Sequence, residues 1–159
     1  MADEKMIRAK QVYQTLCKAL DDNDWHYKKD DEKLKVECGA RGDDLPMELA
    51  IQVDVERQLV MLISHLPFVI AEDKRLDVAV AVSCINNMLV HGCFDYNVTS
   101  GHLFFRMTNS FVESQIHAEV CTYLLYCACQ TIDEYNDKLL CLGKGMISVE
   151  QFIESCNKD

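Results

Sequence analysis

The chain has 159 residues, of which 49% are hydrophobic and 26% are charged, and its formal net charge is −10. This balance is typical of a globular protein, so we expect residues 1–159 to form a single domain. Phosphate binding needs a basic stripe, which the sequence lacks, so both nucleic acid and an anionic membrane surface are poor candidate partners.

The first predicted elements are a helix and a pair of strands. Residues 4–20 carry apolar side chains at helical spacing, which predicts an amphipathic helix. Trp25–Tyr27 begins an extended segment, and the polar run Lys28–Lys33 predicts a turn. Residues 34–38 alternate between apolar and polar side chains, which is typical of a strand.

Two strands with different patterns follow. Residues 47–55 alternate strictly, which predicts a strand with one buried face, whereas residues 58–66 are apolar on both faces. A two-residue loop between them would pair Val53 with Val60 and put the Val60 side in the core. A three-residue loop would pair Val53 with Met61 and reverse that choice. The first face of the second strand comprises Val60, Leu62 and Leu66, and the other comprises Leu59, Met61 and Ile63.

A long helix and a hairpin are predicted next. Pro67 closes the preceding strand, and residues 72–90 form a largely buried helix that Gly92 stops. Residues 93–98 and 102–107 form the hairpin. The helix carries its main predicted stripe on Leu76, Ala79, Val80, Ser83, Asn87 and Val90, widened by Val82, Ile85 and Leu89.

The chain then returns to helices. Residues 112–137 predict a long helix, residues 143–145 (Gly-Lys-Gly) break it, and Ser148 with Gln151 predicts a capping box that opens a last short helix. The element order is helix, four strands, helix, two strands, helix, helix. This order predicts an α+β fold, in which an antiparallel sheet of about five to six strands has helices on one face.

Four segments in this order resemble one family. They are the strand end at Ile63–Pro67 with the charged helix start at Glu72–Arg75, the run Ile85–Tyr96, the turn and strand Gly101–Arg106, and Ile132–Asp137. Over roughly residues 9–154 the chain is similar to the YbjN-type domain, the family described as bacterial sensory transduction regulators. The resemblance implies the type III secretion chaperone-like fold, a dimer and a regulatory or protein-binding role. The family has no catalytic signature to carry over.

The two-faced strand is the candidate partner-binding site. Its second apolar face, formed by Leu59, Met61 and Ile63, must be covered by a second subunit, a partner peptide or the domain's own helices. We therefore expect a non-enzymatic binding module without a cofactor, either a regulatory adaptor or a chaperone for one secreted effector. A thiol- or metal-dependent sensor or enzyme is the remaining alternative.

Three polar groups and the cysteines could support other functions. His117 and Cys121 are four apart and could both reach a metal, although no further ligand is indicated. Asn86 or Asn87 is expected to brace the hairpin that follows. Arg106, with His102 on the same strand face, could bind an anion, but we expect it either to lie on a solvated strand face or to form a salt bridge with an acidic neighbour.

The cysteines and the N-terminus indicate the compartment. Nine cysteines, an odd count without a CxxC pair, predict free thiols in a reducing cytoplasm. The charged start Met1–Lys5 is unlike a signal peptide, and no stretch reaches the ~18 apolar residues that a membrane span needs. We therefore expect a cytoplasmic protein.

Overall fold

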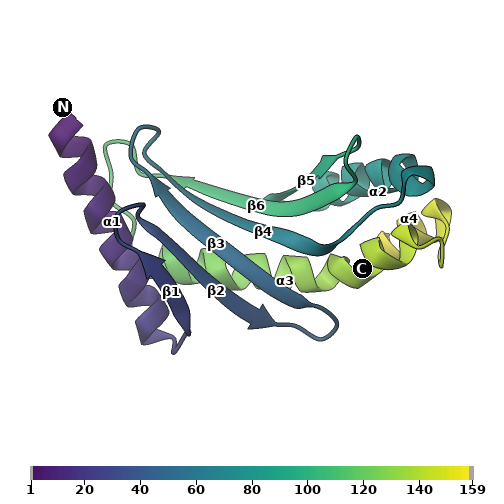
Figure 1. Cartoon of the computed structure of the whole chain (residues 1–159), viewed down its shortest axis with the longest axis horizontal. Coiled ribbons are helices and arrows are strands. Elements are labelled where there is room, and N and C mark those ends of the chain that lie inside the picture. Colours follow the sequence, from purple (N-terminus) through teal and green to yellow (C-terminus); the bar gives the residue numbers. More distant parts are fainter. Residues whose placement is uncertain (1, 158–159) are drawn as a thin grey trace.

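The computed structural model describes residues 2–157 and has the predicted α+β architecture, a six-stranded antiparallel sheet with helices on one face (Figure 1). Its elements are α1 (Ala2–Asp22), β1 (Tyr27–Asp30), β2 (Lys35–Arg41), β3 (Pro46–Asp54), β4 (Leu59–Val69), the 3-10 helix η1 (Glu72–Lys74), α2 (Arg75–Met88), β5 (Cys93–Asn97), β6 (His102–Ser110), α3 (Ala118–Gly143) and α4 (Val149–Cys156).

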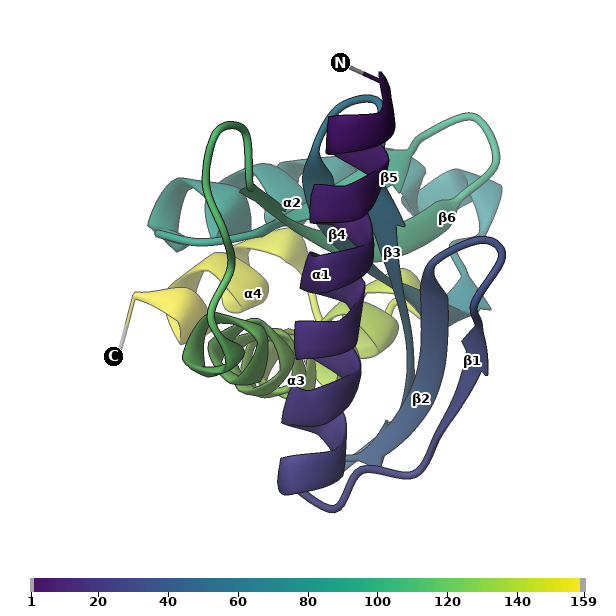
Figure 2. The same ribbon diagram turned by 90° about the vertical axis from the view of Figure 1, so that its left-hand side faces the viewer.

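The strands lie in the order β1-β2-β3-β4-β6-β5, and every neighbouring pair is antiparallel. Helices α1 and α3 pack against each other and against the central strands, while α2 lies against β5, α3 and α4. Seen from the α1 side, all four helices lie on one side of a strongly twisted sheet (Figure 2). We call the other side the open face.

The hairpin between β3 and β4 decides which face of β4 is buried. Val53 pairs with Val60, which is the register of a two-residue loop, and the alternative pairing with Met61 is wrong. Val60 and Leu62 are therefore buried against the helices, together with the predicted apolar face of β3. A shift of one residue would have exchanged the two faces of β4.

The bounds of β1 and of β4 differ from the predictions. Residues Tyr27–Asp30 form β1, so the predicted turn over Lys28–Lys33 begins later, and Leu34 lies in it with φ 49° rather than in a strand. Pro67 does not end β4. The pairing of β4 with β6 shifts between His65 and Val69, and a proline without a backbone N–H is tolerated at such an irregularity.

Helix α2 is shorter than predicted and faces the other way. It ends at Met88, with Leu89 already extended, and Gly92 lies in the loop before β5 rather than capping the helix. The predicted stripe is wrong, because Leu76 is 75% and Val80 is 47% exposed. The helix is apolar on two sides, and helical spacing alone cannot choose between them. The face that packs inward is Val78, Ala81, Val82 and Ile85.

Helix α3 starts and ends later than predicted. Residues 112–117 form a connection in which Glu113 has φ 52°, and His117 is the extended residue before the helix. The helix then continues to Gly143, because Leu139 and Leu142 extend its buried face beyond the predicted end. At the C-terminus the predicted capping box is confirmed, since Ser148 and Gln151 each bond to the other's backbone N–H.

The predicted asparagine brace is also confirmed, and Asn86 provides it. Its side-chain Nδ2 donates to the carbonyl of Phe94 at 2.9 Å, and its Oδ1 accepts the Phe94 N–H at 2.8 Å. The amide thus takes the place of a neighbouring strand for one residue of β5, and it joins β5 to α2.

Candidate functional site

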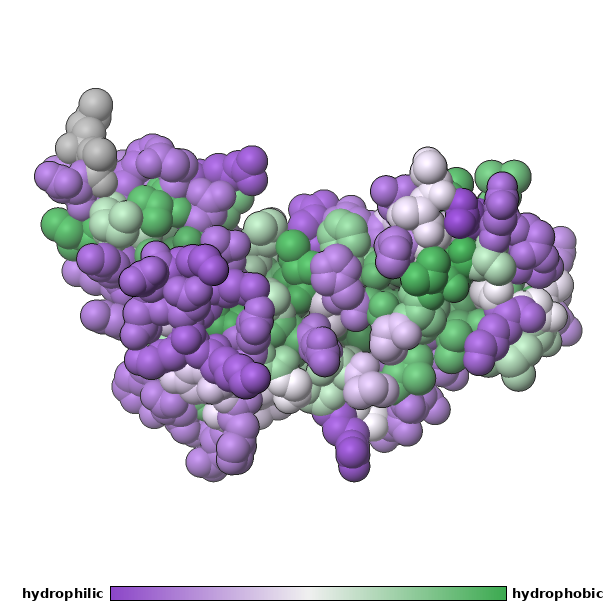
Figure 3. All heavy atoms as spheres, in the orientation of Figure 1, coloured by the Kyte–Doolittle hydropathy of each residue, from purple (hydrophilic) through white to green (hydrophobic). Residues whose placement is uncertain are grey.

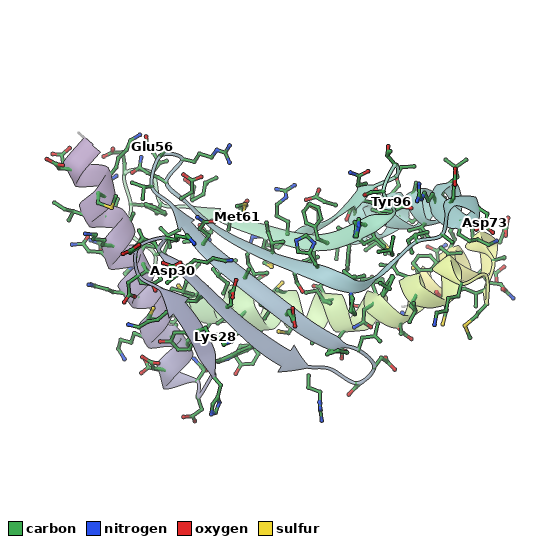
Figure 4. The ribbon with its side chains drawn as sticks, viewed as in Figure 1. Lys28, Asp30, Glu56, Met61, Asp73 and Tyr96 are labelled. Carbon is green, nitrogen blue, oxygen red and sulfur yellow. The ribbon has the colours of Figure 1, made fainter. Side chains whose placement is uncertain are left out.

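The apolar residues predicted to bind a partner lie on the open face. Leu59, Met61 and Ile63 alternate with the buried side of β4 and are all partly exposed. They sit in the middle of the sheet, because β4 is flanked by β3 on one side and β6 on the other. Figure 4 shows Met61 near the centre of this face, well away from the helices. None of the chain's described helices covers this stripe.

The stripe forms part of a hollow that we call the open-face hollow. Its volume is about 800 Å³, and it extends from β4 across β3 and β2 to β1. Hydrophobic residues gather over the middle of the open face, and hydrophilic ones border them on the β1 and β2 side (Figure 3). The residues that line the hollow include Met61, Ile63 and His65 of β4, Glu48, Ala50 and Gln52 of β3, Lys35, Glu37 and Gly39 of β2, and His26 and Lys28 beside them.

Charged side chains on the open face are largely paired with one another. Lys35 Nζ lies 2.5 Å from Glu37 Oε1, and this contact lowers the pKa of Glu37. On the far side of the stripe, Arg106 Nε donates to Asp95 at 2.6 Å. That hydrogen bond raises the pKa of Arg106 above its usual value. The hollow is lined by two lysines and two glutamates, so its rim is polar and close to neutral.

Of the two alternatives expected for Arg106, a solvated strand face or a salt bridge, the structure has the salt bridge, with Asp95 as the partner. His102 shares the open face but lies at the other end of the ladder, opposite Asn97, whereas Arg106 lies opposite Cys93. The side chains of His102 and Arg106 do not converge on one point. An anion hook built from both is not supported by this geometry.

A second, smaller hollow lies at the outer edge of β2, and the sequence analysis missed it. This edge hollow has a volume of about 340 Å³ and includes Trp25, whose ring meets that of Tyr126 edge-on at 6.3 Å. Tyr126 is 53% exposed although it is aromatic. Trp25, the only tryptophan of the chain, was a signal in the sequence that could have indicated this hollow. Its contact with Tyr126 could not be predicted, because the two residues are about a hundred positions apart in the sequence. The edge hollow is lined by Asn23, Asp24, Trp25, His26, Gly39, Ala40 and Tyr126.

The metal and thiol candidates are not brought together into a reactive site. His117 precedes α3 while Cys121 is fully buried, and residues 2–157 contain no group of three or more His, Cys, Asp or Glu that could hold a metal. Burial raises the pKa of Cys121 to about 11 and that of Cys38 to about 12. Cys93, on the open face, also has a raised pKa, chiefly through burial. Such thiols are protonated near neutral pH and are weak nucleophiles. All nine cysteines are free.

Comparisons with known proteins identify the fold. No protein-family model matches the sequence, and no curated protein matches it significantly. Among solved structures, the chain is similar to the crystal structure of YbjN, "a putative transcription regulator from E. coli", with a TM-score of 0.56 and 14% sequence identity. The match covers 79% of this chain and 92% of that one. The two proteins therefore share a fold. Across residues 2–157, the helices include none with the length and apolarity of a bilayer span.

Proposed function

We propose that this chain is a non-enzymatic protein-binding module, a regulatory adaptor or chaperone-like protein of the cytoplasm, and that it holds its partner on the open face. The observation that carries the proposal is the uncovered stripe of Leu59, Met61 and Ile63, of which Met61 and Ile63 line a hollow of about 800 Å³. Single exposed apolar residues are common on protein surfaces, but a continuous stripe in a concave surface with a polar rim is typical of a binding site.

The energetics of the stripe favour a protein partner. Covering one such side chain removes apolar surface from water. Because each is already partly buried, it contributes less than the roughly 1.5–3 kcal/mol of a fully exposed side chain. The three side chains lie next to one another, and the small side chain of Ala50 beside Ile63 leaves space for a side chain of the partner. The ion pair Lys35–Glu37 near them can stay in contact with water. The likeness in fold to YbjN supports a regulatory role by analogy, since fold alone does not determine function.

A homodimer is part of the same proposal, and we place its contact on the outer side of α2. Leu76 and Val80 lie one helical turn apart there and are strongly exposed, although their spacing is that of a buried helix face. A second copy would convert this side of α2 into a core shared by two subunits. Light scattering at micromolar concentration should give twice the mass of one chain. Leu76→Lys should halve that mass, whereas a monomeric wild type would exclude the dimer.

The partner is tested by affinity capture from a lysate of the source organism. Tagged wild type is compared with Met61→Asp, which places a carboxylate in the centre of the stripe. The matched control is His102→Asp, which places a carboxylate on the same face at the far end of β6, where His102 is exposed and lies outside the hollow.

The expected result is one protein that wild type and His102→Asp retain and Met61→Asp loses. An unpaired carboxylate buried under a partner costs several kcal/mol, so the affinity should fall by more than about a hundredfold. Met61 is partly exposed, so the variant should keep the far-UV spectrum and melting temperature of the wild type. If all three columns retain the same proteins, the open face is not the binding site.

A further inference from the structure

Gly39 occupies the interior of β2, where glycine weakens a strand and needs a reason. The usual reasons lie within the chain itself, and none applies. The residue has no positive φ, and the β2–β3 register runs through it without a bulge, with Gly39 opposite Glu48. A Cβ at this position would meet only the Met47 carbonyl oxygen, at an ordinary 3.7 Å. The remaining reason is the close approach of something outside the chain.

The position of Gly39 indicates where that approach occurs. Gly39 and His26 are the two residues that line both the open-face hollow and the edge hollow. In β2, Lys35 and Glu37 direct their side chains to the open face, and Gly39 follows them at the same two-residue spacing. A side chain at position 39 would therefore stand in the passage between the two hollows. Without one, the two hollows meet at Gly39 and His26.

The path leads over an uncovered part of the sheet edge. Strand β1 pairs with β2 only as far as Tyr27 opposite Cys38, so β1 leaves residues 39–41 of β2 without a neighbour on that side. Trp25 and Tyr126 stand beside this edge in the edge hollow. Aromatic rings at the end of an exposed edge provide an anchor for an apolar side chain of a bound chain.

The charge beyond the aromatic pair is negative and has no counter-ion among the described residues. Asp24 lines the edge hollow itself. About 10 Å farther along α3, Asp133 accepts the backbone N–H of Asp43 at 3.0 Å, and Asp44 and Asp137 lie close by. Burial, then the neighbouring carboxylates, raise the pKa of Asp44. The salt bridges within residues 2–157 include none of these carboxylates, so a cationic group would be stabilised there.

We propose that the path from Met61 over Gly39 to Trp25 and Tyr126 binds one extended segment of a partner protein. The segment presents apolar side chains to the β4 stripe and an apolar or aromatic side chain to the edge hollow. Lysine or arginine follows beside Asp24 and the carboxylates beyond it. This inference rests on the proposed function and specifies the conformation and chemistry of the partner. A second copy of the chain is a poorer occupant, because it also carries a net charge of −10.

The test uses a phage-displayed library of random peptides about ten residues long, a length that spans roughly 33 Å when extended. The library is selected on the full-length wild type alone, so that the response to Gly39→Leu, which fills the passage, is not fixed in advance. Selected peptides are then synthesised, and their affinities for the variants are measured by fluorescence anisotropy. His102→Trp is the matched control, because it adds similar bulk to the open face at the far end of β6, where His102 is exposed and lines neither hollow.

We expect peptides that combine apolar residues with a terminal lysine or arginine. They should bind wild type and His102→Trp equally, and Gly39→Leu and Met61→Asp at least tenfold more weakly. Asp24→Asn should weaken binding severalfold. It removes the charge without strain, because asparagine also tolerates the φ of 56° at this position. Gly39→Leu should melt no lower than wild type, since leucine has a higher strand propensity than glycine.

Three outcomes would overturn the inference. Peptides that lose affinity for Met61→Asp but bind Gly39→Leu normally would retain the proposed function and reject the path over Gly39. Peptides that bind Met61→Asp normally would reject the open face, and with it the proposed function. If selection enriches nothing and Gly39→Leu converts a wild-type dimer into monomers, the occupant is a second copy of this chain rather than a partner's segment.

Discussion

The replacement of Asn86 by alanine tests how β5 is held in place. The Asn86 amide makes two hydrogen bonds to the backbone of Phe94, of 2.9 and 2.8 Å, and alanine makes neither. Each such bond contributes about 1 kcal/mol net, and each backbone group left without a partner in a partly buried position adds to the loss. We therefore expect Asn86→Ala to lower the free energy of unfolding by about 2–4 kcal/mol.

The assay is urea unfolding followed by circular dichroism and by tryptophan fluorescence, with Asn87→Ala as the matched control. Asn87 is the next residue on α2 and is exposed, so its replacement should change the unfolding free energy by no more than about 0.5 kcal/mol. The slope against urea should be the same for both variants, because the same surface is exposed on unfolding. A loss below about 1 kcal/mol for Asn86→Ala, or equal losses for the two variants, would refute the assignment of the brace.

Three further predictions concern the caps, the glycines and the thiols. Ser148→Ala removes the side-chain acceptor of the capping box and should cost about 1 kcal/mol in thermal unfolding; no change in melting temperature would show that α4 does not need its cap. Gly92→Ala should lower the free energy of unfolding by at least about 2 kcal/mol, since φ is 81° and the new Cβ would collide with the Phe105 ring. Gly39→Ala should not lower it, because its Cβ meets no close neighbour, and equal losses for the two variants would contradict the steric argument. Burial raises the pKa of Cys38 from 9.0 to about 12, because the folded protein stabilises the neutral thiol. Its contribution to the free energy of unfolding is therefore complete below pH 9. As the pH rises from 9 toward 12, this contribution is lost at about 1.4 kcal/mol per pH unit. Cys38→Ala should flatten the alkaline decline measured by urea unfolding, and an unchanged decline would exclude this thiol as its source.

The sequence by itself determined the fold class, the order of the elements and the local chemistry. Strict alternation over residues 47–55 can bury only one side of a strand, so β3 was predictable in place and in orientation. The capping box at Ser148 and the asparagine brace depend on groups near each other in the chain, and both were predictable for that reason. The residues of the candidate stripe were identified for the same reason, because they alternate along a single strand.

Only the tertiary structure decided which of two apolar faces is buried. Strand β4 and helix α2 are each apolar on two sides, and periodicity cannot choose between such sides. The pairing of Val53 with Val60 decided it for β4 and left Met61 outward, whereas packing against β5, α3 and α4 decided it for α2 and left Leu76 outward. The edge hollow needed the fold as well, because Trp25 and Tyr126 come together only when α3 packs beside the edge of β2.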